Sequence, residues 1–380
     1  MIFVIRLGRE SFFLYIRGEK ALGFDSRVAE NRTKKNKKRM IAYKYRSGRG
    51  TKDDDGKDIF ERDIELLSQD TIYIPTIEQL NDPAEALFDD SLFNLQMKLF
   101  KPFASSGSME RVKVALHDLY NKVRSSGIYS LSMEPVNELM WAYYASGHCG
   151  YAIIFDTEVL SKSFKEVKYD NMYEIDMVYS RNLPRFDITR IKRQSIEDML
   201  QCFVGNKSKV WEHEAEHRLV FDKGGRELKI DYRAIKGFLF GCRMVEKDID
   251  FIMKTFSGRN LDYSKIVLKD NSYELTLKKL KDRYPTPEKY CPNKVEYDIE
   301  ELLKNDELIG CVGYKYRSFV EAALKEVSRE PFVIGINHIV VTDDQQYPNI
   351  LIWTNINQED TYRPYRKFEY DVVGGRLVAR

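Results

Sequence analysis

The chain has 380 residues, of which 43% are hydrophobic, and its formal net charge is +2 at neutral pH. This length accommodates one large domain or two ordinary domains with a substantial core. The near balance of charge favours no particular class of partner, and the lack of a long apolar stretch excludes a membrane-spanning helix. The five cysteines are widely spaced without a C-x-x-C pair, so we expect reduced thiols and a cytoplasmic protein.

The N-terminal region is basic. Lys and Arg recur from Asn31 to Gly50, and no acidic residue interrupts them. We expect residues 1–39 to form a flexible leader outside the fold, because they lack a sustained core pattern. Residues 32–49 are a candidate contact for the phosphates of nucleic acid.

From Ile41 onward, strand and helix signals alternate. Runs of β-branched and aromatic residues predict strands, and capping residues or Pro before a periodic segment predict helices. The expected strands span residues 41–45, 71–75, 127–132, 150–156, 235–241 and 263–268. The expected helices span 63–68, a polar-rich region from Pro83 to about Ser125, 137–146 and 246–255. Trp141 and Tyr144 share one helical face with His148, which follows the helix.

Residues 213–217 read HEAEH and match the H-E-x-x-H pattern of zinc proteases. That pattern binds zinc from a helix, whereas residues 211–221 alternate with a period of two and are soon followed by Gly224 and Gly225. We therefore expect a strand from Trp211 to Phe221 that forms a hairpin with Arg226–Ile230. We expect no zinc and no other bound metal.

Three prolines between Tyr284 and Lys294 predict a boundary. Beyond it we expect helices over 295–304 and 319–328 and strands over 332–342 and 350–354. The predicted fold class is α+β (mixed α/β), with a largely antiparallel central sheet and flanking helices. A core domain of residues 40–283 carries the candidate site, and residues 284–380 form a small C-terminal α+β extension.

Glu214, Glu216 and Arg218 project from one face of the strand predicted after Trp211. An exposed sheet face that carries a structural ion pair explains the same pattern, so the residues leave both interpretations open. His148 follows a glycine cap on a loop, where side chains often face a pocket. The candidate catalytic residues are Glu216, Glu214, Arg218 and His148.

Several motifs together resemble a bacterial family catalogued as domain of unknown function 2971. They are YKYRS (43–47), LNDPAE (80–85), YSLS (129–132), MWAYYASGHCGYAIIFD (140–156), WEHEAEHRLVF (211–221) and IKGFLFG (235–241). They occur in this order between about Ile41 and about Leu280. The resemblance implies no reaction.

A second resemblance does imply a reaction. Arg46, then Ser130-Leu131-Ser132, then Glu214-Ala215-Glu216 follow the motif order of ADP-ribosyltransferases of the Arg–Ser–Glu type, although the middle motif departs from the usual Ser-Thr-Ser. The resemblance implies NAD as co-substrate and a carboxylate that stabilises positive charge on the ribose as nicotinamide leaves. The NAD-binding residues taken from it are Arg46, Tyr45, Ser130, Ser132, Trp141, Tyr144, Asn81 and Asp82.

An enzyme of this type would hydrolyse NAD or transfer ADP-ribose to a macromolecule, protein or nucleic acid, and would suit a toxin or a phage-defence effector. Two other classes fit the same residues. One is a nucleic-acid-binding protein or metal-dependent nuclease, in which the basic segment guides phosphate and the acidic cluster holds Mg²⁺. The other is a non-catalytic binding module that uses the glutamate face. The sequence leaves these alternatives open.

Overall fold

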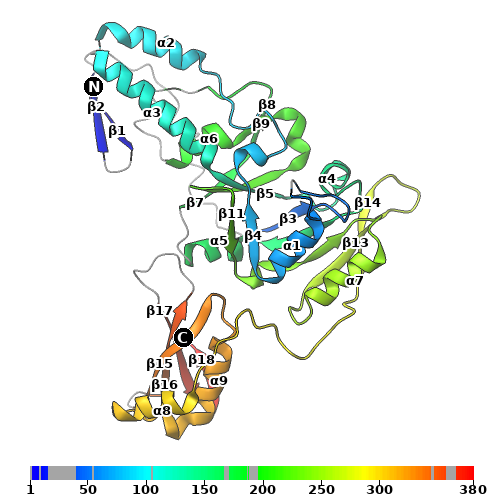
Figure 1. Ribbon diagram of the computed structural model, residues 1–380, viewed down its shortest axis with the longest axis vertical. Helices are drawn as coiled ribbons and strands as arrows, with labels where there is room; N and C mark the ends of the chain where they lie inside the picture. Colours follow the sequence, from blue (N-terminus) through cyan, green and yellow to red (C-terminus); the bar gives the residue numbers. More distant parts are fainter. Residues whose placement is uncertain are drawn as a thin grey trace.

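The computed structural model describes residues 2–7, 10–15, 40–53, 55–103, 106–166, 171–185, 187, 196–343, 346–356 and 365–380. Its main feature is an eight-stranded sheet with the strand order β14-β13-β12-β6-β3-β5-β10-β7 (Figure 1). The strands are β3 (Ile41–Arg46), β5 (Gly127–Ser132), β6 (Tyr151–Asp156), β7 (Met172–Asp176), β10 (Glu216–Phe221), β12 (Ile235–Phe240), β13 (Asp262–Leu268) and β14 (Leu275–Leu280). Neighbouring strands are antiparallel except β12 and β13. The predicted α+β class with a largely antiparallel central sheet is confirmed.

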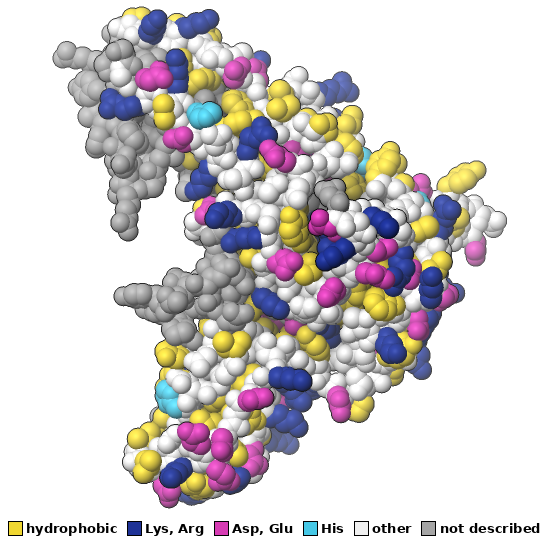
Figure 2. Space-filling view, in the orientation of Figure 1, with side chains coloured by type: hydrophobic (Ala, Val, Ile, Leu, Met, Phe, Trp, Pro, Cys, Tyr) yellow, Lys and Arg dark blue, Asp and Glu magenta, His cyan; other side chains and the backbone are white. Residues whose placement is uncertain are grey.

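The C-terminal unit, residues 299–380, lies at the lower end of the view in Figures 1 and 2 and builds a core of its own. An antiparallel sheet in the order β15-β16-β17-β18 packs against two helices through buried residues such as Leu303, Leu324 and Ile352. The elements are α8 (Ile299–Leu308), α9 (Arg317–Val327), β15 (Val333–Thr342), β16 (Asn349–Ile356), β17 (Tyr365–Val373) and β18 (Arg376–Ala379).

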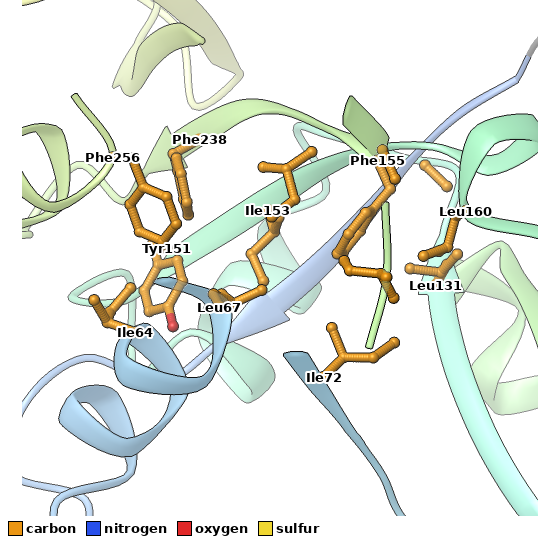
Figure 3. Packing of buried hydrophobic residues seen from close by; sticks show 14 of the residues in the cluster. Ile64, Leu67, Ile72, Leu131, Tyr151, Ile153, Phe155, Leu160, Phe238 and Phe256 are labelled. Atoms are coloured by element: carbon orange, nitrogen blue, oxygen red, sulfur yellow. The ribbon is translucent and has the colours of Figure 1, made fainter. Parts of the chain in front are cut away.

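Both faces of the central sheet are covered by helices. One face packs against α1 (Ile59–Ser68), α5 (Thr157–Glu166) and α7 (Glu246–Thr255) around the apolar cluster shown in Figure 3. The opposite face packs against α4 (Glu138–Tyr144), and nearer β7 against α2 (Ser91–Phe100), α3 (Ser106–Ser125) and α6 (Ile196–Val204). Alternate strand residues serve the two faces, so Leu219 packs in the first cluster while Val220 packs with α6.

Helix α1 shows why the local sequence suits this arrangement. The Asp58 side chain accepts hydrogen bonds from the main-chain N–H groups of Phe60 and Glu61 and so caps the helix. Phe60, Ile64 and Leu67 then fall on one helical face and are buried against the sheet.

Three predictions between β3 and β12 are wrong. The strand predicted from Trp211 begins only at Glu216, because residues Lys209–Glu214 form a 3-10 helix, η6. The predicted hairpin is absent because β10 has β5 and β7 on its two edges, so β11 (Arg226–Lys229) pairs with β4 (Thr71–Ile74) instead. Pro83 also begins no helix, since residues 83–86 form a turn and α2 begins at Ser91.

Two small sheets complete the described structure. β1 (Ile2–Leu7) and β2 (Glu10–Tyr15) pair with each other in antiparallel fashion, and β8 (Val178–Ser180) pairs in parallel with β9 (Asn206–Ser208). Residues 16–39, which include the first part of the basic segment, lie outside the described residues. Within the described part of the chain, no helix has the length and apolarity that crossing a bilayer requires.

Candidate functional site

A cleft of about 790 Å³ opens where the central sheet is split between β3 and β5. β3 pairs with β6 from Ile41 to Arg46, but its register with β5 consists of Tyr43 opposite Ser132 alone. Side chains from both faces of β3 therefore reach the cleft, Tyr43 and Tyr45 from one face and Lys44 and Arg46 from the other.

The sheet brings together motif residues that are far apart in the sequence. Ser132 of β5 lies opposite Tyr43 of β3 on one side and opposite Glu216 of β10 on the other. Ser130, two residues earlier, lies opposite Arg218. Because Arg46 ends β3 and lines the same cleft, the three motifs contribute to one cleft from three neighbouring strands.

A buried ion network forms one wall of this cleft, with the fully buried Arg218 at its centre. Arg218 donates to the Glu216 carboxylate through Nε at 2.8 Å and Nη2 at 3.0 Å. It also donates to Glu85 through Nη1 at 2.8 Å and Nη2 at 2.5 Å. The Lys207 ammonium donates to Glu214 at 2.5 Å and to Glu216 at 3.2 Å. Three carboxylates thus share two cations through charge-assisted hydrogen bonds.

The network keeps the Glu216 carboxylate charged. Burial raises the pKa of Glu216, but the charges of Arg218 and Lys207 outweigh burial and lower that pKa to about 2. The Tyr144 hydroxyl donates to Glu214 Oε1 at 2.5 Å, and burial together with this carboxylate raises the pKa of Tyr144. At neutral pH the wall therefore presents an ionised carboxylate and a protonated phenol.

Period-two alternation predicts Glu214 on the strand, but Glu214 joins the network from the preceding 3-10 helix. It ends η6, and Ala215 then takes a left-handed conformation with φ 43° and ψ 51° before β10 begins. This turn points Glu214 and Glu216 toward the same ammonium group of Lys207. Glu216 and Arg218 do share a strand face, as predicted, whereas Glu214 joins them through the turn.

The other wall of the cleft is cationic. Arg46 donates through Nε to Asp63 at 2.6 Å, and Arg62 donates to the other oxygen of Asp63 at 3.3 Å and to Asp53 at 2.9 Å. Lys44 lies between this wall and the ion network, with Nζ 2.8 Å from the main-chain oxygen of Ser130. Among the described lining residues, the cations are Lys44, Arg46, Arg62, Lys207 and Arg218, and the carboxylates are Glu85, Glu214 and Glu216. Asp63 and Asp53, which are not in the lining, offset much of the charge of Arg46 and Arg62.

Nine of the sequence-predicted residues line this cleft. They are Tyr45, Arg46, Asn81, Ser130, Ser132, Tyr144, Glu214, Glu216 and Arg218. Asn81 Nδ2 lies 3.4 Å from the Tyr144 hydroxyl, and Tyr45 donates to the main-chain oxygen of Glu134 at 2.5 Å.

Trp141, His148 and Asp82 are not in the cleft lining. Trp141 is fully buried, donates from Nε1 to the oxygen of Pro135 at 2.9 Å, and packs edge-on against Tyr45 at 5.1 Å between ring centroids. His148 sits in a left-handed conformation at the end of the turn after α4, where its main-chain oxygen accepts from Arg243 N–H. Asp82 caps a turn by accepting from Ala84 N–H at 2.9 Å. Trp141 and Asp82 thus support the cleft through packing and capping.

Sequence reasoning did not single out Tyr43, Lys44, Arg62 and Lys207, all of which line the cleft. Tyr43 and Lys44 stand beside Arg46 within YKYRS, and only the split between β3 and β5 shows that both faces of that strand reach one cleft. Glu85 belongs to LNDPAE, but its ion pair with Arg218 joins residues 133 positions apart. No local pattern marks Lys207.

The HEAEH residues do not take the helical form that zinc proteases require. His213 lies on η6 and His217 on β10, and their Nδ1 atoms face the oxygen of Val210 at 2.9 Å and Asp176 Oδ1 at 3.2 Å. In the part of the chain that the structure describes, no three His, Cys, Asp or Glu side chains are grouped so as to hold a metal.

The described end of the basic segment is engaged within the fold. Arg46 is bound to Asp63, and Arg49 donates to Asp248 at 2.6 Å and contacts Glu61. Residues 32–39 lie outside the described residues. On the face shown in Figure 2, basic and acidic side chains are interspersed.

No curated protein and no solved structure matches the chain. Residues 140–219 match a family model described as "Protein of unknown function (DUF2971)". This segment contains Tyr144, Lys207, Glu214, Glu216 and Arg218 of the cleft wall, so the part of the chain that is similar to this family includes the buried ion network except Glu85.

Proposed function

We propose that this cleft binds NAD and that the protein cleaves the nicotinamide–ribose bond, passing ADP-ribose to a macromolecule or to water. The observation that carries the proposal is the convergence of Arg46, Ser132 and Glu216 on three neighbouring strands around one cleft. These residues represent the three motifs whose order resembles that of ADP-ribosyltransferases. The cleft volume of about 790 Å³ also lies in the range of pockets that enclose small ligands.

The charge layout suits this substrate. Arg46 and Arg62 offer guanidinium groups to a pyrophosphate, and such groups bind phosphate oxygens in a forked geometry. The ionised Glu216 lies on the opposite wall, where a ribose would need negative charge. Tyr43, which is partly exposed on β3, provides an aromatic surface for a base.

The chemistry follows from the charge of Glu216. Departure of neutral nicotinamide leaves positive charge on the ribose, and an ionised carboxylate stabilises that charge. A carboxylate offers about four acceptor positions, and Arg218, Lys207 and the Ser130 side chain together fill those of Glu216. A ribose hydroxyl would therefore bind Glu216 by taking the place of the Ser130 hydroxyl. The Ser132 hydroxyl donates to the main-chain oxygen of Glu214 at 2.7 Å and so positions the segment that carries both glutamates.

The same network gives little support to a metal-dependent nuclease. Glu85, Glu214 and Glu216 are each within salt-bridge distance of Lys207 or Arg218. A divalent cation placed beside these carboxylates would meet two positive side chains and little net negative charge. Hard cations such as Mg²⁺ bind instead where oxygen ligands carry the charge.

The test is consumption of NAD and transfer of label from NAD labelled in the adenylate, with cell lysate or nucleic acid as acceptor. We expect Glu216→Gln to lower turnover by about a hundredfold or more, because it removes the charge while nearly preserving volume. Arg218 keeps Glu85 as a partner, so the variant should fold. If the wild type leaves NAD intact with every acceptor, and NAD does not raise its melting temperature, the proposal is wrong.

Asp70→Asn provides a matched control for the loss of a buried carboxylate. Asp70 is buried and pairs with the buried Arg259 at 2.5 Å, outside the cleft lining. Asn tolerates the left-handed conformation of Asp70, which has a φ of 55°. Both variants should lose stability, but only Glu216→Gln should lose turnover. Equal losses of turnover would mean that Glu216 acts through stability alone.

A further inference from the structure

Lys44 differs from the other cations of the cleft. Arg46, Arg62, Lys207 and Arg218 each pair with at least one carboxylate. Among the described residues, no carboxylate is paired with the Lys44 ammonium. Its recorded contacts are the hydrogen bond to the oxygen of Ser130 at 2.8 Å and the Tyr129 ring, whose centroid lies 4.6 Å away.

The titratable groups around Lys44 come from four elements, and their charges nearly cancel. Arg46 follows on β3, and Arg218 faces it from β10, so two guanidinium groups oppose its protonation. Glu216 on β10 and Asp63 on α1 favour protonation, but both are already paired, with Arg218 and with Arg46.

Tyr129 on β5 is a further titratable neighbour of Lys44. Burial raises the pKa of Tyr129, so its hydroxyl is neutral and adds no charge. Loss of water around Nζ therefore lowers the pKa of Lys44 more than Glu216 and Asp63 raise it. Burial, with Arg46 adding to it, lowers the pKa of Lys44 to about 7, so a substantial fraction of the amine is uncharged at neutral pH.

The position of Nζ suits a role in chemistry. It lies in the split between β3 and β5, between the cationic wall and the carboxylate network. The two glutamates of the network are poor bases for an attacking group. Glu216 is held ionised with a depressed pKa, and Glu214 accepts bonds from Tyr144 and Lys207.

We propose that Lys44 is the general base of the NAD reaction. Its uncharged Nζ takes the proton of the acceptor, a hydroxyl of a macromolecule or a water molecule. The acceptor oxygen then bonds to ribose C1′ while the C1′–N1 bond breaks, and nicotinamide leaves as a neutral base with the electron pair of that bond. The products are ADP-ribosylated acceptor or ADP-ribose, nicotinamide and protonated Lys44. This assignment rests on the function proposed above.

The first experiment measures the amine without NAD. The full-length protein is acetylated at trace level from about pH 5.5 to about pH 10, and modification of each lysine is followed by mass spectrometry. Lys44 should react with a midpoint near 7, whereas Lys265, a partly buried strand lysine bonded to the oxygen of Met244 and to Glu246, provides the matched comparison. A Lys44 midpoint near the ordinary value of about 10.4 would overturn the proposal.

The second experiment compares Lys44→Met, Lys44→Arg and Lys265→Met in the NAD assay over the same pH range. Loss of a general base lowers turnover by about a hundredfold or more. Lys44→Arg should lose as much as Lys44→Met, because a guanidinium stays protonated, while NAD should still raise the melting temperature of both variants. The wild-type rate should fall below about pH 7, and that acid limb should disappear in both Lys44 variants.

Each outcome has a distinct meaning. Full activity in Lys44→Arg would show that Lys44 serves as a phosphate contact. Unchanged activity in Lys44→Met would show that Lys44 has no role in the reaction. Either result overturns the base assignment but leaves the proposal of NAD cleavage intact. A wild type that does not consume NAD overturns the proposed function itself. Lys265→Met should match the wild type, and a loss there would invalidate the comparison with Lys44 and count against the assignment.

Discussion

At the scale of single residues, Ala215 controls how the two glutamates are presented. Its left-handed backbone costs an L-residue roughly 1–2 kcal/mol, which glycine does not incur. We expect Ala215→Gly to be neutral or to stabilise the protein by up to about 1 kcal/mol, since the added freedom of the unfolded chain offsets part of the gain. Ala215→Val should destabilise by about 2 kcal/mol, because β-branched residues rarely adopt this conformation. Urea denaturation measures both changes, and a Val variant as stable as the wild type would contradict this account.

The acid sensitivity of Glu216 is a second prediction at this scale. The pKa of Glu216 is about 2 in the folded protein and has the ordinary value of 4.5 in the unfolded chain. A depressed carboxylate pKa stabilises the folded state above the unfolded value, and this stabilisation is lost as the pH falls from about 4.5 toward about 2. The full contribution is on the order of 3 kcal/mol.

Comparison with Glu216→Gln isolates this contribution. The stability advantage of the wild type over the variant should shrink between about pH 5 and about pH 3, as measured by urea denaturation. A difference that does not vary with pH would mean that Glu216 titrates normally in the folded protein. Such a result would also remove the reason to regard its carboxylate as permanently ionised.

At the scale of elements, Asn137 connects α4 to η6. Its Oδ1 accepts from Leu139 and Met140 N–H at 2.9 and 3.2 Å, and its Nδ2 donates to the oxygen of His213 at 3.0 Å. Asn137→Asp keeps the cap and loses the donor, whereas Asn137→Ala loses both. We expect Ala to cost about 1–2 kcal/mol and Asp clearly less, because a carboxylate is favourable at a helix N-terminus. Thermal denaturation compares the two variants, and equal losses would show that the cap contributes little.

The sequence predicted elements best where local signals were strong. β3, β5, α7 and β13 appear close to their predicted bounds, because residue periodicity and nearby glycines mark their ends. Prediction failed at Trp211–Glu214, where alternating residues adopt a 3-10 helix. It failed again for the hairpin, because the edges of β10 are occupied by strands from elsewhere in the chain. Period-two alternation describes which side chains would share a face and says nothing about which strand will be the partner.

At the scale of the whole molecule, the C-terminal unit is expected to behave as a separate cooperative unit. Its core is its own, and recorded contacts with the rest of the chain include Arg233 with Glu330 at 3.2 Å and Asn293 with the oxygen of Val333 at 2.6 Å. Leu303 is fully buried in that core, so Leu303→Ala should destabilise the unit by about 2–5 kcal/mol. Hydrogen exchange should rise in residues 299–380 and stay unchanged in β3, β5 and β10. A uniform rise would contradict the division at Tyr284, which until then remains a prediction from the prolines.

The sequence by itself determined the α+β class, the largely antiparallel sheet and nine of the residues that line the cleft. These follow from short-range periodicity and from motifs, which any single segment displays without its partners. The tertiary structure decided which of those residues meet. Four features of the cleft depend on segments that are far apart in the sequence. They are the split between β3 and β5, the pairing of Arg218 with Glu85, the contact of Lys207 with Glu214, and the hydrogen bond of Lys44 to the Ser130 oxygen. Strand order and burial set these contacts, and both depend on how the whole chain packs, so no local pattern in the sequence records them.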